Sequence, residues 1–167
     1  TGATADSEIY DRTTSATISG SSLVGIVGAD DVTVSNTGTF DSANAGTAKT
    51  VTSTQTLSGA DAAKYTLTLP TGLTADITPK VLTVGSAAAQ NKPYDTTNTA
   101  TITGTLEGVI APDDVTLNGT GTFATTAVGT GITVTSTSTL TGADAANYVL
   151  TQPTALTADI TAVPQFT

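Results

Sequence analysis

The stretch GADAAKY at residues 59–65 recurs as GADAANY at residues 142–148, and this repetition decides the architecture of the chain. The offset between the two stretches is 142 − 59 = 83 residues. The pentapeptide TADIT at residues 74–78 recurs at the same offset, at residues 157–161. Matched segments at a fixed offset are typical of a structural unit that occurs more than once in a chain. We therefore predict two tandem copies of one module.

The two copies differ near their beginnings. Tyr10-Asp11 recurs as Tyr94-Asp95, at an offset of 84, so the first copy carries one extra residue, which we place in a loop before Asp30. The strand-like run KVLTV at residues 80–84 maps ahead of residue 1 in the first copy. We therefore expect the first module to lack most of its first strand, and the parent protein to continue in the N-terminal direction. The predicted segments are module 1 at 1–79, module 2 at 80–162 and a tail at 163–167.

Apolar residues alternate with polar ones along most of the chain. Leu73, Ala75 and Ile77 share one face of a run in which the intervening residues are polar, and this period of two is typical of a half-buried strand. The chain holds 41 threonines, a β-branched residue that favours strands. The single plausible helix in each copy is one short turn, with Asp61 or Asp144 as its N-cap.

These patterns predict an all-β fold of two tandem β-sandwich modules that are immunoglobulin-like. The alternative is a pair of β-grasp-like modules, each with one short helix. Between the last strand of the first copy and the first strand of the second lie only Thr78, Pro79 and Lys80. Three residues span about 10 Å at full extension, which is too short for one module to fold back along the other. We therefore expect the modules to lie end to end.

The composition excludes several classes of function. The formal net charge is −9, and an acidic surface repels phosphate backbones and anionic lipid, so we expect neither a nucleic-acid partner nor membrane insertion. The chain has no Cys and no His, so thiol nucleophiles, thiolate ligands and the commonest general base are all missing. No lysine recurs between the copies, which argues against a crosslink built into the repeat. We expect a protein that is not an enzyme.

Acidic residues recur in pairs, and calcium is the cofactor to consider. The candidate ligands are Asp30 and Asp31 in the first copy and Asp113 and Asp114 in the second. Calcium takes oxygen ligands, but calcium loops alternate acidic residues at close spacing over a longer motif than this. We favour the interpretation that these aspartates cap turns and the short helix, and that the protein has no metal site.

The aromatic residues also recur in pairs, at positions that we expect to serve the cores. The chain has only 4 Tyr and 3 Phe, so it offers few rings on which a sugar could stack. The recurring pairs are Tyr10 and Tyr94, Tyr65 and Tyr148, and Phe40 and Phe123.

An ordered series of motifs in the second copy resembles a known family. The series is KPYD at 92–95, PDDVTL at 112–117 and GTGTF at 119–123, followed by GADAANY and TADIT. It resembles the YDG-type repeats of large bacterial surface adhesins, which are related to MBG domains, and the resemblance covers nearly the whole chain in two copies. The glycine that follows Tyr-Asp in that family is Arg12 in the first copy and Thr96 in the second. Because a β-branched threonine is strained at positive φ, we infer that this turn does not require positive φ here.

The resemblance implies a non-catalytic, extracellular stalk repeat on the bacterial cell surface or in a secreted protein. Its partners would be the neighbouring repeats of the same chain, and we expect a monomer. The alternative is an adhesive module that itself binds a host or cell-surface glycan or another surface protein. A family of this kind supplies no catalytic residues to carry over to this chain.

Overall fold

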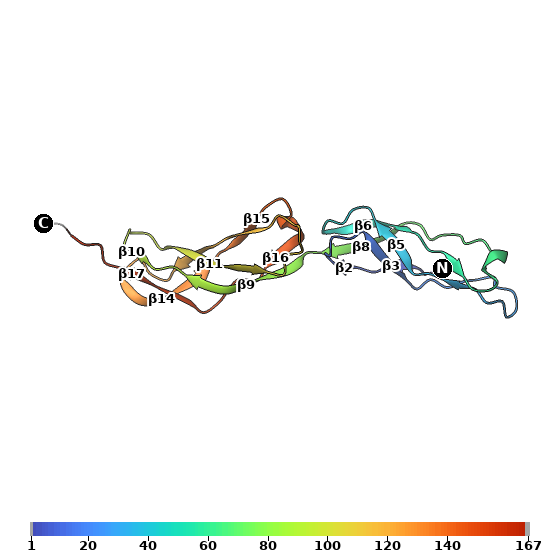
Figure 1. Ribbon diagram of the computed structural model, residues 1–167, viewed down its shortest axis with the longest axis horizontal. Helices are drawn as coiled ribbons and strands as arrows, with labels where there is room; N and C mark the ends of the chain where they lie inside the picture. The colour runs from blue at the N-terminus through green and yellow to red at the C-terminus, as the bar shows by residue number, and fades with distance from the viewer. Residues whose placement is uncertain (1, 166–167) are drawn as a thin grey trace. The chain divides into compact units, whose positions relative to one another are not determined.

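The computed structural model describes residues 2–165, which are almost entirely β-strand and connecting loop (Figure 1). The chain divides into two compact units, Thr1–Pro79 and Lys80–Thr167. The all-β fold class expected from the alternating pattern is confirmed. The described residues hold no helix that is long and apolar enough to cross a membrane.

Unit 1 is built on one six-stranded sheet and a small separate ribbon. The sheet is antiparallel except at its edge, where β2 runs parallel to β8. In sheet order its strands are β1 (Thr4–Ala5), β3 (Ser15–Ser19), β5 (Thr37–Phe40), β6 (Gly46–Ser53), β8 (Leu73–Thr78) and β2 (Glu8–Ile9). The ribbon pairs β4 (Thr33–Val34) with β7 (Leu57–Ser58).

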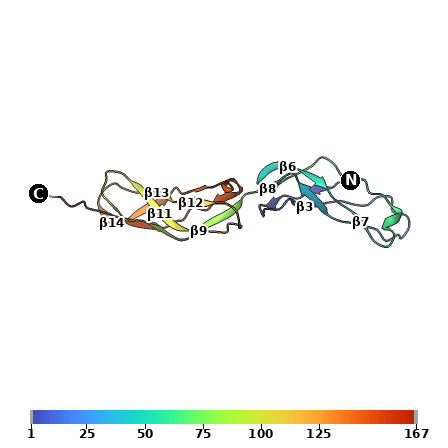
Figure 2. The ribbon, with the colours of Figure 1, turned by 45° about the horizontal axis from the view of Figure 1, so that its top comes forward.

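Unit 2 repeats this plan with one strand more, and Figure 2 shows its sheet from a second direction. In sheet order its strands are β10 (Lys92–Pro93), β17 (Leu156–Thr161), β14 (Gly129–Ser136), β13 (Thr120–Phe123), β11 (Thr99–Glu107), β9 (Lys80–Ala89) and β16 (Tyr148–Leu150). Its ribbon pairs β12 (Thr116–Asn118) with β15 (Thr139–Thr141).

Each core is formed by the inward residues of the sheet, every second position along each strand. The core of unit 2 consists of Ala100, Ile102, Phe123, Val134, Leu156, Ala158 and Ile160. The buried residues at the matching positions of unit 1 are Ala16, Ile18, Phe40, Val51, Leu73, Ala75 and Ile77. Burying one such side chain stabilises a fold by about 1.5–3 kcal/mol relative to leaving it exposed. The agreement of the two sets shows that both copies use the same inward face.

The main difference between the units is β9. This strand pairs antiparallel with β11 and parallel with β16. In unit 1 the strand β1, which pairs with β3, corresponds to the final part of β9. Residues 65–67, which match β16, form no strand in unit 1.

The short helical segments are 3-10 turns of three residues, η1 (Ala62–Lys64) and η2 (Ala145–Asn147). The short helix of the β-grasp alternative therefore corresponds to one three-residue turn in each unit. Asp61 and Asp144 stand at the N-cap positions, but neither makes a side-chain capping hydrogen bond. The predicted capping role is wrong, because these carboxylates accept hydrogen bonds from a different loop.

The aromatic positions are buried as expected, with two exceptions. Tyr10 and Tyr148 are buried, with 4% and 6% exposure, whereas Tyr94 is 43% exposed and Tyr65 is half-buried. The prediction that Tyr94 lies inside its module is wrong. Tyr94 directly follows β10 just as Tyr10 directly follows β2, so matching positions of the two units differ in burial.

Candidate functional site

The recurring aspartates lie in one loop region of each unit, next to the 3-10 turn. In unit 2 the Tyr148 hydroxyl donates a hydrogen bond to Asp113 Oδ2 at 2.6 Å and accepts one from the Ile110 N–H at 3.1 Å. In unit 1 the Tyr65 hydroxyl donates to Asp30 Oδ2 at 2.8 Å. Asp30 and Asp113, the first aspartate of each pair, therefore fix the tyrosine that follows the 3-10 turn by accepting a hydrogen bond from its hydroxyl.

The second aspartate of each pair is part of a reciprocal clamp. The Asp114 N–H donates to Asp144 Oδ2 at 2.8 Å, and the Asp144 N–H donates to the Asp114 carbonyl at 3.1 Å. The Ala143 N–H donates to Asp114 Oδ2 at 3.2 Å. Gly142 has a φ of 116°, and a Cβ there would collide with the Asp114 carbonyl oxygen. Glycine is thus required for the close approach of the two loops.

Unit 1 builds the same clamp from Asp31 and Asp61, where the Asp31 N–H donates to Asp61 Oδ2 at 2.9 Å. It adds a cation that unit 2 lacks at this position, because Lys64 corresponds to Asn147. Lys64 Nζ lies 2.6 Å from Asp61 Oδ1 and 3.7 Å from Asp30 Oδ2. The hydrogen bond from Lys64, followed by that from the Asp31 N–H, lowers the pKa of Asp61.

The calcium candidates Asp30, Asp31, Asp113 and Asp114 are therefore brought near other carboxylates, but as acceptors for the protein's own donors. Within residues 2–165 no group of three or more His, Cys, Asp or Glu side chains is arranged to hold a metal ion. The arrangement joins two loops through backbone and tyrosine hydrogen bonds, and this is a structural role.

The Tyr-Asp turn is a second recurring feature, and in unit 2 it is closed by a lysine. Lys92 Nζ lies 2.8 Å from Asp95 Oδ1 and donates to the Thr97 carbonyl at 2.9 Å. The Thr97 N–H donates to the same Asp95 oxygen at 2.9 Å. These contacts, with that from Lys92 the largest, lower the pKa of Asp95 to about 2. Lys92 Nζ also lies 5.8 Å from the centre of the Phe123 ring, which ties the turn to the core.

The inference that this turn does not require positive φ is wrong. Arg12 has a φ of 71° and Thr96 a φ of 70°. The physical reason is the side-chain hydrogen bond across the turn, from the N–H two residues after each aspartate, on Thr13 or Thr97. That bond forms an Asx-turn, which offsets part of the cost of the left-handed conformation at the residue in between.

In unit 1 the position of Lys92 is taken by Glu8, which reverses the charge beside the turn. Glu8 Oε1 is buried and has no hydrogen-bond partner among residues 2–165. Burial, and then the charge of Asp11, raise the pKa of Glu8. In unit 1 the carboxylates of Glu8 and Asp11 thus lie near each other at this turn. In unit 2 the matching residues, Lys92 and Asp95, form an ion pair.

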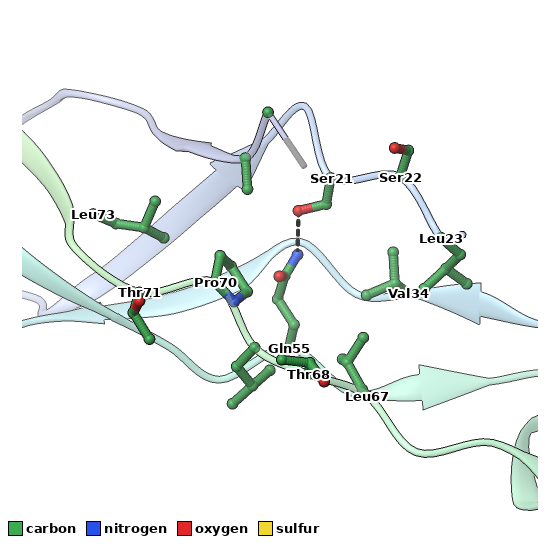
Figure 3. A pocket seen from close by; sticks show the side chains of 13 residues that line it. Ser21, Ser22, Leu23, Val34, Gln55, Leu67, Thr68, Pro70, Thr71 and Leu73 are labelled. Carbon is green, nitrogen blue, oxygen red and sulfur yellow. Dashed lines mark hydrogen bonds between the residues drawn. The ribbon is translucent and has the colours of Figure 1, made fainter. Parts of the chain in front are cut away.

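Unit 1 also contains an apolar groove. Figure 3 shows its wall residues, and its volume is about 460 Å³. Its walls are residues 21–23 on one side and 67–71 on the other, with Leu73 and Val34 in the lining. A second cavity of about 250 Å³ shares part of both walls and reaches Tyr65. On the groove wall, Gln55 Nε2 donates to Ser21 Oγ at 2.9 Å and to the Ser35 carbonyl at 2.8 Å.

The sequence did not predict this groove, because its walls are two segments that are far apart in the chain.

A repeated, all-β module with a Tyr-Asp turn after a short edge strand places the chain among the β-rich repeat domains. The YDG domain family matches residues 1–73 and 78–155, and the chain belongs to this family. No curated protein and no solved structure matches the chain.

Proposed function

We propose that the chain is a non-catalytic, extracellular repeat segment of a bacterial surface adhesin, which serves as a stalk or spacer that holds a binding region away from the cell. The observation that carries the proposal is the direct joining of the two units. Strand β8 ends at Thr78 and β9 begins at Lys80, so Pro79 is the only residue between two strands. A connection of one proline, with its φ fixed, has little slack, and this suits a spacer.

The use of the recurring polar residues supports the same proposal. The aspartates that repeat between the units accept hydrogen bonds from loop N–H groups and tyrosine hydroxyls. Asp113 accepts one from the Tyr148 hydroxyl, and Asp114 accepts one from the Ala143 N–H. A residue that repeats because it closes a turn serves the fold of every module. Repetition of fold-forming residues, without a repeated arrangement of reactive groups, is what a spacer array needs.

The second candidate function is adhesion by the module itself, to a glycan or to another surface protein. Tyr94 favours it, because its ring is 43% exposed and sugars stack on exposed aromatic rings. The matching Tyr10 of unit 1 is only 4% exposed, so such a site belongs to unit 2 alone.

Two experiments test the two proposals. For the spacer, chains of one, two and four units are compared by small-angle X-ray scattering, which measures the longest dimension of each chain. A spacer gives an end-to-end distance that grows in proportion to the number of units, whereas flexible joints give growth with its square root. Square-root growth would contradict the spacer role.

A glycan array probed with the wild-type chain and with Tyr94→Ala tests adhesion. The adhesion proposal predicts that the wild-type chain binds and that the substitution abolishes this binding.

A further inference from the structure

The dipeptide Asn118-Gly119 is the only Asn-Gly pair in the chain. Asn118 is the last residue of β12, and Gly119 separates it from β13, which begins at Thr120. Strand β12 belongs to the two-stranded ribbon of unit 2, whereas β13 belongs to the main sheet. The pair therefore lies where the chain passes from one sheet to the other.

The side chain of Asn118 is exposed and weakly held. Its Nδ2 donates a hydrogen bond to Thr139 Oγ1 at 3.3 Å, which is long for an N–H···O bond. Within residues 2–165 its side chain has no second hydrogen bond. Water reaches this amide, and the amide can turn toward the backbone.

The backbone nitrogen of Gly119 is equally accessible. Its N–H has no hydrogen-bond partner in the part of the chain that the structure describes, residues 2–165. Glycine also carries no side chain that could obstruct an approach to its own nitrogen. This nitrogen and the side-chain carbonyl carbon of Asn118 are separated by the atoms of a five-membered ring, so a bond between them closes that ring.

The ribbon that holds Asn118 is short enough to open locally. It has three residue pairs, and the pair of Asn118 with Thr139 is at its end. A two-stranded ribbon is only marginally stable, and the ends of such elements open far more often than the strands of a central sheet. Opening of the ribbon releases the extended backbone at Asn118 and lets it rotate into the geometry of ring closure.

Other asparagines of the chain are controls within the same molecule. Unit 1 has Ser35 and Asn36 at the positions of Asn118 and Gly119, at an offset of 83, so it lacks the Asn-Gly pair. Asn36 and Asn98 are both exposed, but each precedes a threonine. The β-branched threonine side chain crowds the nitrogen that would have to attack.

We propose that Asn118 is a site of spontaneous deamidation, at which the chain modifies itself without an enzyme. The Gly119 nitrogen forms a bond to Cγ of Asn118, and the side-chain nitrogen leaves as ammonia, which takes up the proton of the Gly119 N–H through water. One water molecule then opens the succinimide ring. The net change consumes one water and releases one ammonia, with no oxidation or reduction.

The two ways of opening the ring give different products. Attack of water at the side-chain carbonyl gives aspartate, and attack at the main-chain carbonyl gives isoaspartate. Either product adds one negative charge to a chain whose net charge is −9. Isoaspartate also inserts one carbon into the main chain between β12 and β13, which disturbs the pairing of residue 118 with Thr139. The proposal rests on the local geometry of unit 2 and is independent of the spacer role.

The test incubates the folded chain at mildly alkaline pH and follows each asparagine by peptide mass spectrometry, together with the ammonia released. We expect conversion at Asn118 to be at least about tenfold faster than at Asn36 or Asn98, with both aspartate and isoaspartate as products. Asn118→Ser, which introduces the residue of unit 1, is the matched control. It is expected to abolish the fast release of ammonia and to leave the Tm unchanged.

Three outcomes would overturn the proposal. The first is conversion at Asn118 that is no faster than at Asn98, and the second is release of ammonia by the Asn118→Ser chain at the wild-type rate. The third is formation of aspartate without isoaspartate, because direct hydrolysis of the amide needs no ring.

A second variant tests the opening of the ribbon. Leu140→Ala weakens the ribbon from the opposite strand, because Leu140 pairs with Leu117. It is expected to speed conversion at Asn118 and to leave the rate at Asn98 unchanged. An unchanged rate at Asn118, or equal acceleration at both residues, would contradict the role of local opening.

Discussion

Arg12 and Thr96 occupy the same position in the two units, and both have a left-handed backbone, with φ of 71° and 70°. Each follows the aspartate of a Tyr-Asp turn, whose side chain accepts the N–H of the next residue but one. The YDG family is named for a glycine at this position, and glycine is the residue that adopts positive φ without strain. The turn thus has, at Arg12 and Thr96, the conformation that glycine adopts most readily.

Thr96→Gly is therefore expected to stabilise unit 2. A left-handed conformation costs a non-glycine residue about 1–2 kcal/mol, and the greater flexibility of glycine in the unfolded chain offsets part of that gain. We expect a net increase of about 1 kcal/mol in the free energy of unfolding, measured by urea denaturation. The matched control is Thr126→Gly, at an exposed position without positive φ, which is expected to lower stability. Equal destabilisation by both substitutions would show that Thr96 is not strained.

Glu8 predicts a pH dependence that is specific to unit 1. Its pKa is raised in the folded state, so its contribution to stability is present when the side chain is protonated and is lost as pH rises through the folded pKa. Glu8→Gln is expected to raise the Tm at pH 7 and to leave it unchanged at low pH. Thermal unfolding from pH 3 to pH 8 checks this, with Glu107→Gln as the control for the same change in net charge. A parallel shift at every pH would contradict the account.

The Lys92–Asp95 pair predicts the opposite sign in unit 2. The pKa of Asp95 is lowered to about 2, so the contribution of the ionised carboxylate is present above its unfolded value of 3.8 and is lost as pH falls through about 2. Lys92→Ala is expected to move the pKa of Asp95 upward, toward that ordinary value. An NMR titration of the Asp95 side chain measures the shift. An unchanged pKa would show that the turn N–H groups, and not the lysine, set it.

The aspartate clamp predicts stability that does not depend on metal. Asp144→Ala removes the acceptor of the Asp114 N–H and is expected to lower the free energy of unfolding of unit 2 by about 1 kcal/mol.

Addition of EDTA is expected to leave the Tm of the wild-type chain nearly unchanged. A drop of several degrees on chelation would show that the native state binds calcium, because a ligand stabilises the state that binds it.

Alternation and repetition in the sequence predicted the fold class and the inward faces. Leu73, Ala75 and Ile77 are all buried, as the period of two requires, because side chains of a strand alternate between its faces. Repetition predicts that Tyr10 and Tyr94 occupy matching positions, but it does not predict equal burial, and Tyr94 was assigned wrongly for that reason. The positive φ of Thr96 was missed because it follows from a side-chain hydrogen bond, which residue preference alone does not reveal.

The groove was missed because it depends on pairing between distant segments. The sequence placed a KVLTV run at the start of the second copy, but it did not show which two segments that run joins. In unit 2 the run pairs in parallel with residues that follow it by nearly 70 positions, since Lys80 lies opposite Tyr148. Parallel pairing over such a separation leaves no local mark, because neither strand is part of a hairpin with the other.

The most direct test of the central claim about unit 2, that β9 orders the segment after β16, is the amide exchange of Thr151 compared with that of Thr68 in the unmodified chain. Both threonines follow a leucine, so their intrinsic exchange rates are closely matched. The Thr151 N–H donates to the carbonyl of Leu82, and the Thr68 N–H makes no such backbone hydrogen bond within residues 2–165. The account predicts that Thr151 exchanges at least roughly a hundredfold more slowly than Thr68. Equal rates at the two residues would contradict it.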